Sequence, residues 1–454
     1  MPSTSPHIIN RLVLRLHLAD TTDSREVQQR AEQELQSRRL FSSLDEVLSE
    51  LGSPDEWITL ERVVVALGPL QSALLERQLT ERLPDMLRPA MADAVATARS
   101  QGAVRTKDAL DFESFVYFLR NGVLPAYSYV LPVLRQWEPQ LVALVGNLSS
   151  DQQASLRQAL TSANARQRLM TQFSVLLWLA VGTALEPAVA TQLRQLAELL
   201  LQMRHLPYDE AAVPLDSLMW EKIMQRLSYA LPTNWPLVIK QITAVNKAAE
   251  SRQLETARNL LAELLSGENL LASVTHRDAE EELASDVHFV ENAGVVLLHP
   301  FLAVCFEACG WLTDGTFRNE TVQMQAVRLI HFLATGNSQA AEYELLVPKL
   351  LCGMPAHQPQ NARVRLPRQA RVEGLALLNA AIEHWQALKN TSPAGLREGF
   401  LQRDGKLERS ADGRWTLTVE QKAQDLLLDQ LPYGWGLGVV QLPWMPQRLM
   451  INWG

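Results

Sequence analysis

Two cysteines lie at a spacing that would allow them to bind a metal ion together. Cys305 and Cys309 are one helical turn apart, so both side chains would point to the same side of a helix. A structural zinc site needs further Cys or His ligands, and no second pair lies near them in the sequence. Their neighbours Val304, Phe306 and Ala308 are apolar. We therefore favour buried structural cysteines and predict no metal-binding residues.

Nine histidines are the next candidates for metal binding or acid–base catalysis. None belongs to an H-E-x-x-H motif or to another ligand spacing. His299 precedes Pro300 and His331 precedes Phe332, in apolar surroundings where we favour a hydrogen-bonded core histidine over a ligand or base. The others are scattered: His7, His17, His205, His276, His288, His357 and His384.

The sequence motifs of nucleotide and hydrolase chemistry are absent. The chain has no G-x-x-x-x-G-K-[ST], no G-x-G-x-x-G after a strand and no G-x-S-x-G. Three glutamates at 280–282 follow His276 by one turn, but a solvated helix face accounts for them. We therefore predict no catalytic residues, no cofactor-binding residues and no cofactor, and interpret the chain as a protein that is not an enzyme.

A basic loop between residues 355 and 371 could bind an acidic protein surface or a phosphate. It contains Arg363, Arg365, Arg368 and Arg371. No aromatic residues are interleaved with these arginines, and the chain as a whole carries a net charge of −8. We favour a solvated loop and predict no nucleic-acid partner.

Length and composition indicate a folded protein with more than one core. A chain of 454 residues, 47% apolar and 20% charged, is expected to form two or three subdomains. Three cysteines and an amino terminus without a secretory signal predict a cytoplasmic protein. The most apolar stretches, 173–185 and 294–306, fall short of the roughly 20 residues that span a bilayer. We interpret them as buried helix segments and predict no stable membrane insertion.

Residues 1–104 are predicted to form a β-α-β-α module. Leucines alternate with other residues at 12–18, which is typical of a half-buried strand, and residues 57–67 are rich in β-branched side chains. Helical stripes follow each strand: Leu44, Val47, Leu48 and Leu51 after the first, and Leu75, Leu79 and Leu83 after the second.

Residues 105–285 are predicted to be entirely helical. Helix breaks are expected at Gly122, Pro125, Pro139, Gly146, Pro187, Pro207, Pro214, Pro232, Pro236 and Gly267. No fixed repeat length indicates a solenoid. Helix-pair repeats that have diverged too far to be recognised remain an alternative.

Residues 286–454 are predicted to be mixed. Helical stripes run through residues 322–333 and 375–385, and alternation at 414–419 and 449–453 indicates strands. A helix at about 420–430 is expected between these strands, with its inner side formed by Val419, Ala423, Leu426, Leu427 and Gln430. The predicted fold class is thus α+β and predominantly helical, with small α/β units at both ends flanking an all-helical middle.

Several long strings near the two ends of the chain resemble one protein family. They are HIINR (7–11), ITLERVVVALG (58–68), ENAGVVLLHPF (291–301), LLVPKLLCGMP (345–355), GLREGFLQRDGKL (395–407) and LPWMP (442–446). These strings are similar to the tape-measure proteins of extracellular, phage-tail-like contractile injection systems. The resemblance extends over roughly half of the chain, and the helical middle from about 105 to 285 carries no string that matches.

The resemblance implies a protein that controls the length of the inner tube during assembly of the particle. It implies contacts with inner tube subunits, with baseplate hub or spike proteins and with a tube cap, in one or several copies per particle. It also implies a place inside the tube of a released particle, after assembly in the cytoplasm. The family brings no catalytic residues.

The residues restrict how such a protein could measure length. As one helix, 454 residues would reach roughly 680 Å at 1.5 Å per residue, but 23 prolines and 21 glycines exclude one continuous helix. Several copies, a threaded unfolded chain, or regulation from a tube end remain as alternatives. A second hypothesis is an assembly chaperone or docking scaffold for hub or cargo proteins that is absent from the mature particle.

Overall fold

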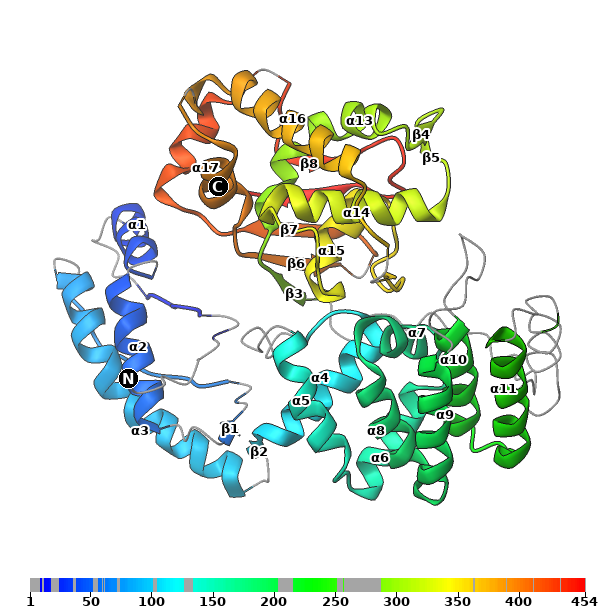
Figure 1. Cartoon of the computed structure of the whole chain (residues 1–454). Coiled ribbons are helices and arrows are strands. Elements are labelled where there is room, and N and C mark those ends of the chain that lie inside the picture. The colour runs from blue at the N-terminus through cyan, green and yellow to red at the C-terminus, as the bar shows by residue number, and fades with distance from the viewer. Residues whose placement is uncertain are drawn as a thin grey trace. The chain divides into compact units, whose positions relative to one another are not determined.

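The computed structural model divides the chain into two compact units, residues 1–113 and 114–454. Helices dominate both units, and the sheets are small (Figure 1). The structure describes residues 9, 12–17, 24–35, 38–51, 56–58, 60, 62–71, 74–100, 104–125, 134–202, 215–250, 256, 287–361, 364–388, 390–410, 412–432 and 434–453.

The first unit is built mainly from three helices. They are α1 (Ser24–Leu35), α2 (Arg38–Leu51) and α3 (Leu75–Ser100). Strands β1 (Glu56–Ile58) and β2 (Val104–Thr106) pair antiparallel. A small apolar cluster of Val27, Ala31, Leu75 and Leu79 joins α1 to α3. The helices predicted around residues 44–51 and 75–83 are thus confirmed.

The two strands predicted for this unit are wrong over most of their length. Residues 12–17 form no strand, and of residues 57–67 only the first two belong to β1, while the other described ones are irregular. The alternation is nevertheless partly realised as burial, because Leu14 and Leu16 pack against the apolar cluster while Arg15 is exposed. An alternating pattern reports which side chains face a core and does not require a hydrogen-bonded neighbour strand.

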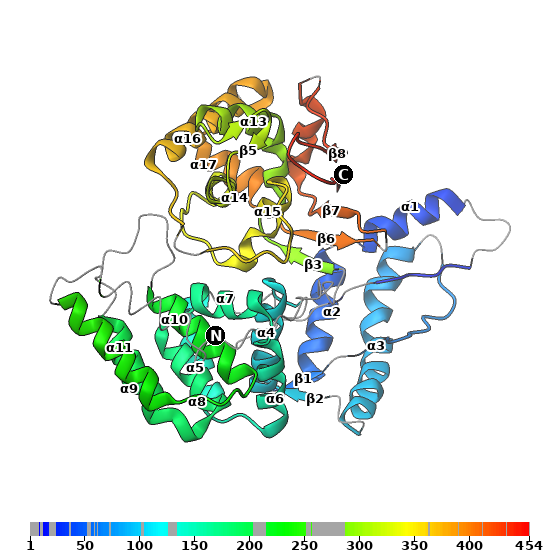
Figure 2. The same ribbon diagram turned by 90° about the vertical axis from the view of Figure 1, so that its right-hand side faces the viewer.

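The helical part of the second unit follows α4 (Lys107–Asn121), which crosses the division between the units. Helices α8, α9 and α11 lie side by side in that order, as both views show (Figures 1 and 2). The helices are α5 (Leu134–Val145), α6 (Ser150–Ala159), α7 (Ala163–Gln172), α8 (Val175–Leu185), α9 (Ala190–Gln202), α10 (Leu215–Ser228) and α11 (Trp235–Glu250).

Most of the predicted breaks in this region coincide with helix ends. Gly122 follows α4 with a φ of +73°, and Gly146 follows α5. The break predicted at Pro139 is wrong, because α5 continues through this residue. The breaks predicted at Pro207, Pro214 and Gly267 lie outside the described residues.

The remainder of the second unit contains a five-stranded sheet in the order β3-β6-β7-β9-β8. All neighbours are antiparallel except β7 and β9, which are parallel. Its strands are β3 (Val287–Val290), β6 (Gly405–Arg409), β7 (Trp415–Val419), β8 (Val439–Val440) and β9 (Leu449–Asn452). A separate hairpin consists of β4 (Leu312–Thr313) and β5 (Thr316–Phe317).

Helices pack with this sheet around one large apolar core. They are η5 (Ala293–Leu298), α13 (His299–Ala308), α14 (Glu320–Thr335), η6 (Glu342–Leu345), α15 (Leu346–Leu351), α16 (Arg368–His384), η7 (Gln386–Leu388), α17 (Pro393–Leu396), η8 (Arg397–Leu401) and η9 (Ala423–Gln430). The two predicted stripes correspond to α14 and α16. The apolar stretches 173–185 and 294–306 form helices that are largely buried, as predicted, although Leu176 and Val304 are exposed.

The predicted fold class, α+β and predominantly helical, is confirmed. Two details in the last third are wrong. The helix expected at 420–430 is a 3₁₀ helix from 423, and Leu426, expected on its inner side, is 76% exposed. Strand β3, which was not predicted, forms one edge of the sheet. The three-domain division at residues 104 and 285 stays a prediction.

Candidate docking pocket of the C-terminal sheet

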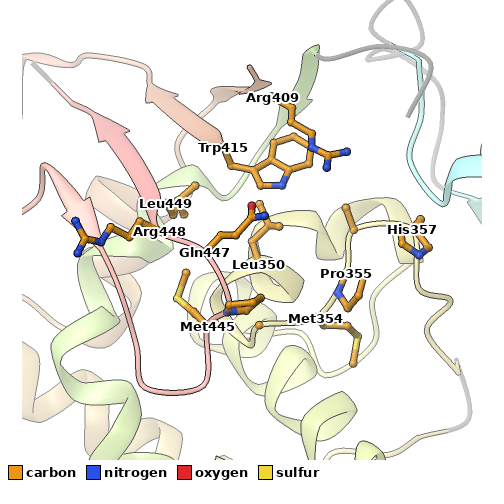
Figure 3. Close-up of a pocket in the computed structure, with 13 residues that line it drawn as sticks. Leu350, Met354, Pro355, His357, Arg409, Trp415, Met445, Gln447, Arg448 and Leu449 are labelled. Carbon is orange, nitrogen blue, oxygen red and sulfur yellow. The ribbon is translucent and has the colours of Figure 1, made fainter. Parts of the chain in front are cut away.

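A pocket of about 310 Å³ opens between the loop after α15 and the ends of β6, β7 and β9 (Figure 3). Figure 3 shows Arg409 and Trp415 at one side of the pocket, with Met445 across from them. The lining residues are Leu350, Gly353, Met354, Pro355, Ala356, His357, Arg409, Trp415, Met445, Pro446, Gln447, Arg448 and Leu449.

A close backbone approach joins the two loops that form the pocket. Gly353 follows α15 with a φ of +67°, in the left-handed region that glycine adopts without strain. A Cβ atom at this position would lie 2.3 Å from the carbonyl oxygen of Trp444. Trp444 in turn donates a hydrogen bond from Nε1 to the carbonyl oxygen of Leu351 at 2.8 Å. The strings LLVPKLLCGMP and LPWMP therefore meet here, and only glycine fits at the meeting point.

The floor of the pocket is apolar and its rim is basic. Met354, Met445 and Trp415 are 2%, 7% and 8% exposed, so their side chains are fixed in the core. The guanidinium of Arg409 lies 5.8 Å from the centre of the Trp415 ring, in a cation–π arrangement. Arg448 is exposed and points away from Trp415 (Figure 3), so Arg409 supplies the positive charge at the rim, and none of the thirteen lining residues is acidic. Such a pocket suits an apolar side chain of a protein partner that carries acidic neighbours.

A buried charge cluster that the sequence did not reveal holds one of these loops. Glu342 accepts a hydrogen bond from Nε of Arg168 at 3.1 Å and another from Nζ of Lys349 at 2.8 Å. All three side chains are at most 1% exposed. Arg168 also donates to the carbonyl oxygen of His357, and Lys349 donates to that of Ala356 at 3.2 Å. The cluster thus ties the pocket loop to α7.

Burial affects the charged state of this cluster. Desolvation lowers the pKa of Lys349, while the neighbouring carboxylate of Glu342 opposes that effect. Gly122 lies directly beside the cluster, because a Cβ atom there would be 2.5 Å from Oε1 of Glu342. The sequence gives little indication of this cluster, because Arg168 lies 174 residues before Glu342, and Lys349 lies 7 residues after it.

The predicted cysteine pair lies together at the edge of the core. Cys305 is buried, Cys309 is half-buried, and both are free thiols. The hydrogen bond that they share raises the pKa of Cys305, with burial acting in the same direction, and lowers the pKa of Cys309. Within the described part of the chain, no group of three His, Cys, Asp or Glu residues is placed to hold a metal ion.

The two histidines for which the sequence predicts core positions, His299 and His331, are at least partly buried. Nδ1 of His299 lies 3.0 Å from the carbonyl oxygen of Val296, and burial lowers its pKa. His331 is 3% exposed, and burial, together with the charge of Arg328, lowers its pKa to about 4. Neither histidine lines the pocket.

The arginines of the basic loop are exposed where the structure describes them. Arg365, Arg368 and Arg371 are exposed, and the last two belong to α16. Arg363 lies outside the described residues.

Comparison with known families decides the class of protein. The family model "Contractile injection system tape measure protein" matches residues 6–453. The chain belongs to this family. The match extends through the helical middle of this tape measure protein, where the sequence offered no recognisable string. No curated protein and no solved structure matches the chain.

Two of the strings that resemble this family pack directly on each other in this tape measure protein. The amide of Ala293 donates to the carbonyl oxygen of Arg403 at 2.9 Å, which joins ENAGVVLLHPF to GLREGFLQRDGKL. A Cβ atom on Gly294 would lie 1.7 Å from the carbonyl oxygen of Phe400, so backbone packs directly on backbone. Among the described residues, no helix has both the length and the apolar character needed to cross a bilayer.

Proposed function

We propose that this tape measure protein controls inner tube length during particle assembly as a folded protein that binds other components. The family match over residues 6–453 carries this proposal. The folded state is supported by two compact units with internal cores. The longest described helix, α3, has 26 residues and thus reaches only about 39 Å at 1.5 Å per residue.

The binding partners that we propose are inner tube subunits, baseplate hub or spike proteins and a tube cap. The apolar floor and basic rim of the pocket support a protein contact, because interface anchors are typically buried apolar groups surrounded by polar ones. The protein would act without catalysis, from the cytoplasm during assembly, and one or several copies could remain inside the tube of a released particle.

A deletion strain tests this function directly. Electron microscopy of particles from the deletion strain should show tubes of irregular length or no assembled particles. Complementation with the wild-type chain should restore a narrow length distribution. Tubes of wild-type length in the deletion strain would contradict the proposal.

Charge reversal at the pocket tests the binding surface. Arg409→Glu reverses the charge that faces Trp415 in the pocket, so we expect a folded protein that fails to restore tube length. Arg414→Glu is the matched control, since Arg414 is exposed in the turn between β6 and β7 but does not line the pocket. Equal complementation by both variants would show that the pocket has no part in assembly.

The compact fold also supports the alternative of an assembly chaperone or docking scaffold. A scaffold that leaves before maturation would be found in cell lysate and missing from purified particles. Quantitative mass spectrometry of purified particles distinguishes the two functions, because a retained length regulator gives a fixed number of copies per tube.

A further inference from the structure

A second cleft, of about 710 Å³, is lined by three arginines from two segments of the chain. It lies between α14, the turn that follows this helix, and the segment that leads into α16 together with the first turn of α16. The lining residues are Arg328, Ser338, Gln339, Val364, Arg365, Leu366 and Arg371. None of them is acidic, so the cleft combines three positive charges with two polar and two apolar side chains.

The buried arginine of this cleft has unused hydrogen-bond donors. Arg328 is 3% exposed, yet its guanidinium donates to only one acceptor in the described structure, the carbonyl oxygen of Asn361 at 3.0 Å. Its Nε has no partner among the described residues. A guanidinium has five N–H donors, and a buried donor without an acceptor is costly, although the nearby charge of Glu342 favours the charged form of Arg328. An oxyanion in the cleft would satisfy these donors.

Two exposed arginines add a preference for anions at the mouth of the cleft. Arg365 and Arg371 are solvent-exposed and line the opening. Guanidinium groups match the planar geometry of carboxylates, with which they form paired hydrogen bonds. Val364 and Leu366 add apolar surface for the stem of a side chain. The volume exceeds what a single small ion fills and lies within the range of ligand-binding clefts.

We propose that this cleft binds an acidic segment of a partner protein. One Glu or Asp carboxylate of that segment binds Arg328, and the neighbouring carboxylates of the same segment bind Arg365 and Arg371. The proposal rests on the proposed function, in which the chain acts through contacts with other proteins. On this proposal the basic segment binds carboxylates of a partner and is not simply a solvated loop.

Peptide binding to the full-length protein tests the cleft. The probe is a fluorescein-labelled hexaglutamate peptide, followed by fluorescence anisotropy, with labelled hexaglutamine as the neutral counterpart. We expect binding of hexaglutamate alone, and about tenfold weaker binding for Arg365→Gln and for Arg371→Gln, because each loses a charge-assisted hydrogen bond. Arg368→Gln is the matched control, since Arg368 is exposed on the same segment but does not line the cleft.

The buried donor is tested by Arg328→Lys, which keeps the charge and removes the planar fork. We expect weaker hexaglutamate binding and an unchanged circular dichroism spectrum. If the lysine variant does not fold, the binding loss in Arg365→Gln still tests the cleft.

Three results would overturn the proposal: no binding of hexaglutamate, equal losses in Arg365→Gln, Arg371→Gln and Arg368→Gln, or competition by inorganic phosphate at the concentration at which the peptide binds. The last would indicate a small-anion site. Normal tubes in the deletion strain would instead reject the proposed function and leave the peptide result standing.

Discussion

The carboxylate of Glu342 pairs with both Arg168 and Lys349 in the core. Removing one partner of a buried ion pair leaves the others as uncompensated buried charges, which typically costs about 3–5 kcal/mol. We therefore expect Glu342→Gln to lower the free energy of unfolding by about that amount. Urea denaturation followed by circular dichroism measures the change.

An exposed ion pair of the same unit provides the control for that substitution. Glu408 pairs with Lys406 at 2.7 Å, but both side chains are more than one third exposed. Such surface pairs contribute little to stability. Glu408→Gln should therefore leave the urea midpoint nearly unchanged, and a similar loss in both variants would argue against a special role of burial.

His331 should make the stability of the protein depend on pH. Its pKa falls from 6.5 to about 4 in the fold, so the unfolded chain binds the proton more tightly. The stabilisation is therefore complete above pH 6.5 and is lost as the pH falls from about 6.5 to about 4. One pKa unit corresponds to about 1.4 kcal/mol, so this residue accounts for about 3 kcal/mol.

The measurement is urea denaturation at pH 7.5 and at pH 4.5. His331→Gln removes the titrating group, so its loss of stability between the two pH values should be smaller than that of the wild type by roughly 2–3 kcal/mol. Parallel pH profiles of the two proteins would show that His331 does not titrate in this way.

At the scale of elements, the packing of η5 on η8 depends on a missing side chain. Gly294→Ala places a methyl group where the carbonyl oxygen of Phe400 would be 1.7 Å away, so the backbone of one segment must shift. Overpacking of this kind costs about 3 kcal/mol. Gly399→Ala is the control one residue from Phe400, because nothing lies within 4 Å of its added methyl group.

Urea denaturation of both glycine variants separates these effects. We expect a clear loss of stability for Gly294→Ala, and no loss for Gly399→Ala. If Gly294→Ala were as stable as the wild type, the close approach of η5 to η8 would not exist in solution.

Periodicity predicted the helices of this protein far better than its strands. The stripe that includes Ala326 and Leu333 gave α14 because the contacts that stabilise a helix are local. Strand β3 escaped notice because it has four residues and pairs with β6, more than 110 residues further along the chain. The alternation around Leu14 and Leu16 predicted burial correctly and pairing wrongly, since pairing depends on a partner strand that the pattern does not specify.

The candidate pocket could be predicted only in part for a related reason. Its loops come from residues 350–357, 409–415 and 445–449, and the local sequence does not specify that they meet. The strings containing Gly353 and Trp444 were recognisable as family strings, but their contact becomes apparent only in the fold. The buried partner of Arg168 was likewise hidden, because Glu342 lies 174 residues away.

At the scale of the whole molecule, we expect two thermal transitions. The two compact units have separate apolar cores, so each should unfold cooperatively. Within residues 114–454 the cluster of Arg168, Glu342 and Lys349 links the helical part to the sheet-containing part. Differential scanning calorimetry of the full chain should therefore show two peaks, and Glu342→Gln should lower or split the larger one.

A control for the calorimetry is Glu408→Gln, which leaves the link intact and should reproduce the wild-type trace. Three peaks in the wild type would favour the division at residues 104 and 285 predicted from the sequence, and would show that the charge cluster does not couple the two parts.

The position of β9 within the sheet has a consequence for how the protein is made. Residues 449–452 follow all other described strands along the chain, yet they lie between β7 and β8. While the ribosome is still translating the preceding codons, the backbone donors and acceptors along one side of β7 have no neighbour from the same chain. Open strand edges invite pairing with other molecules. The nascent chain is therefore most vulnerable to aggregation shortly before its final interior strand emerges from the exit tunnel.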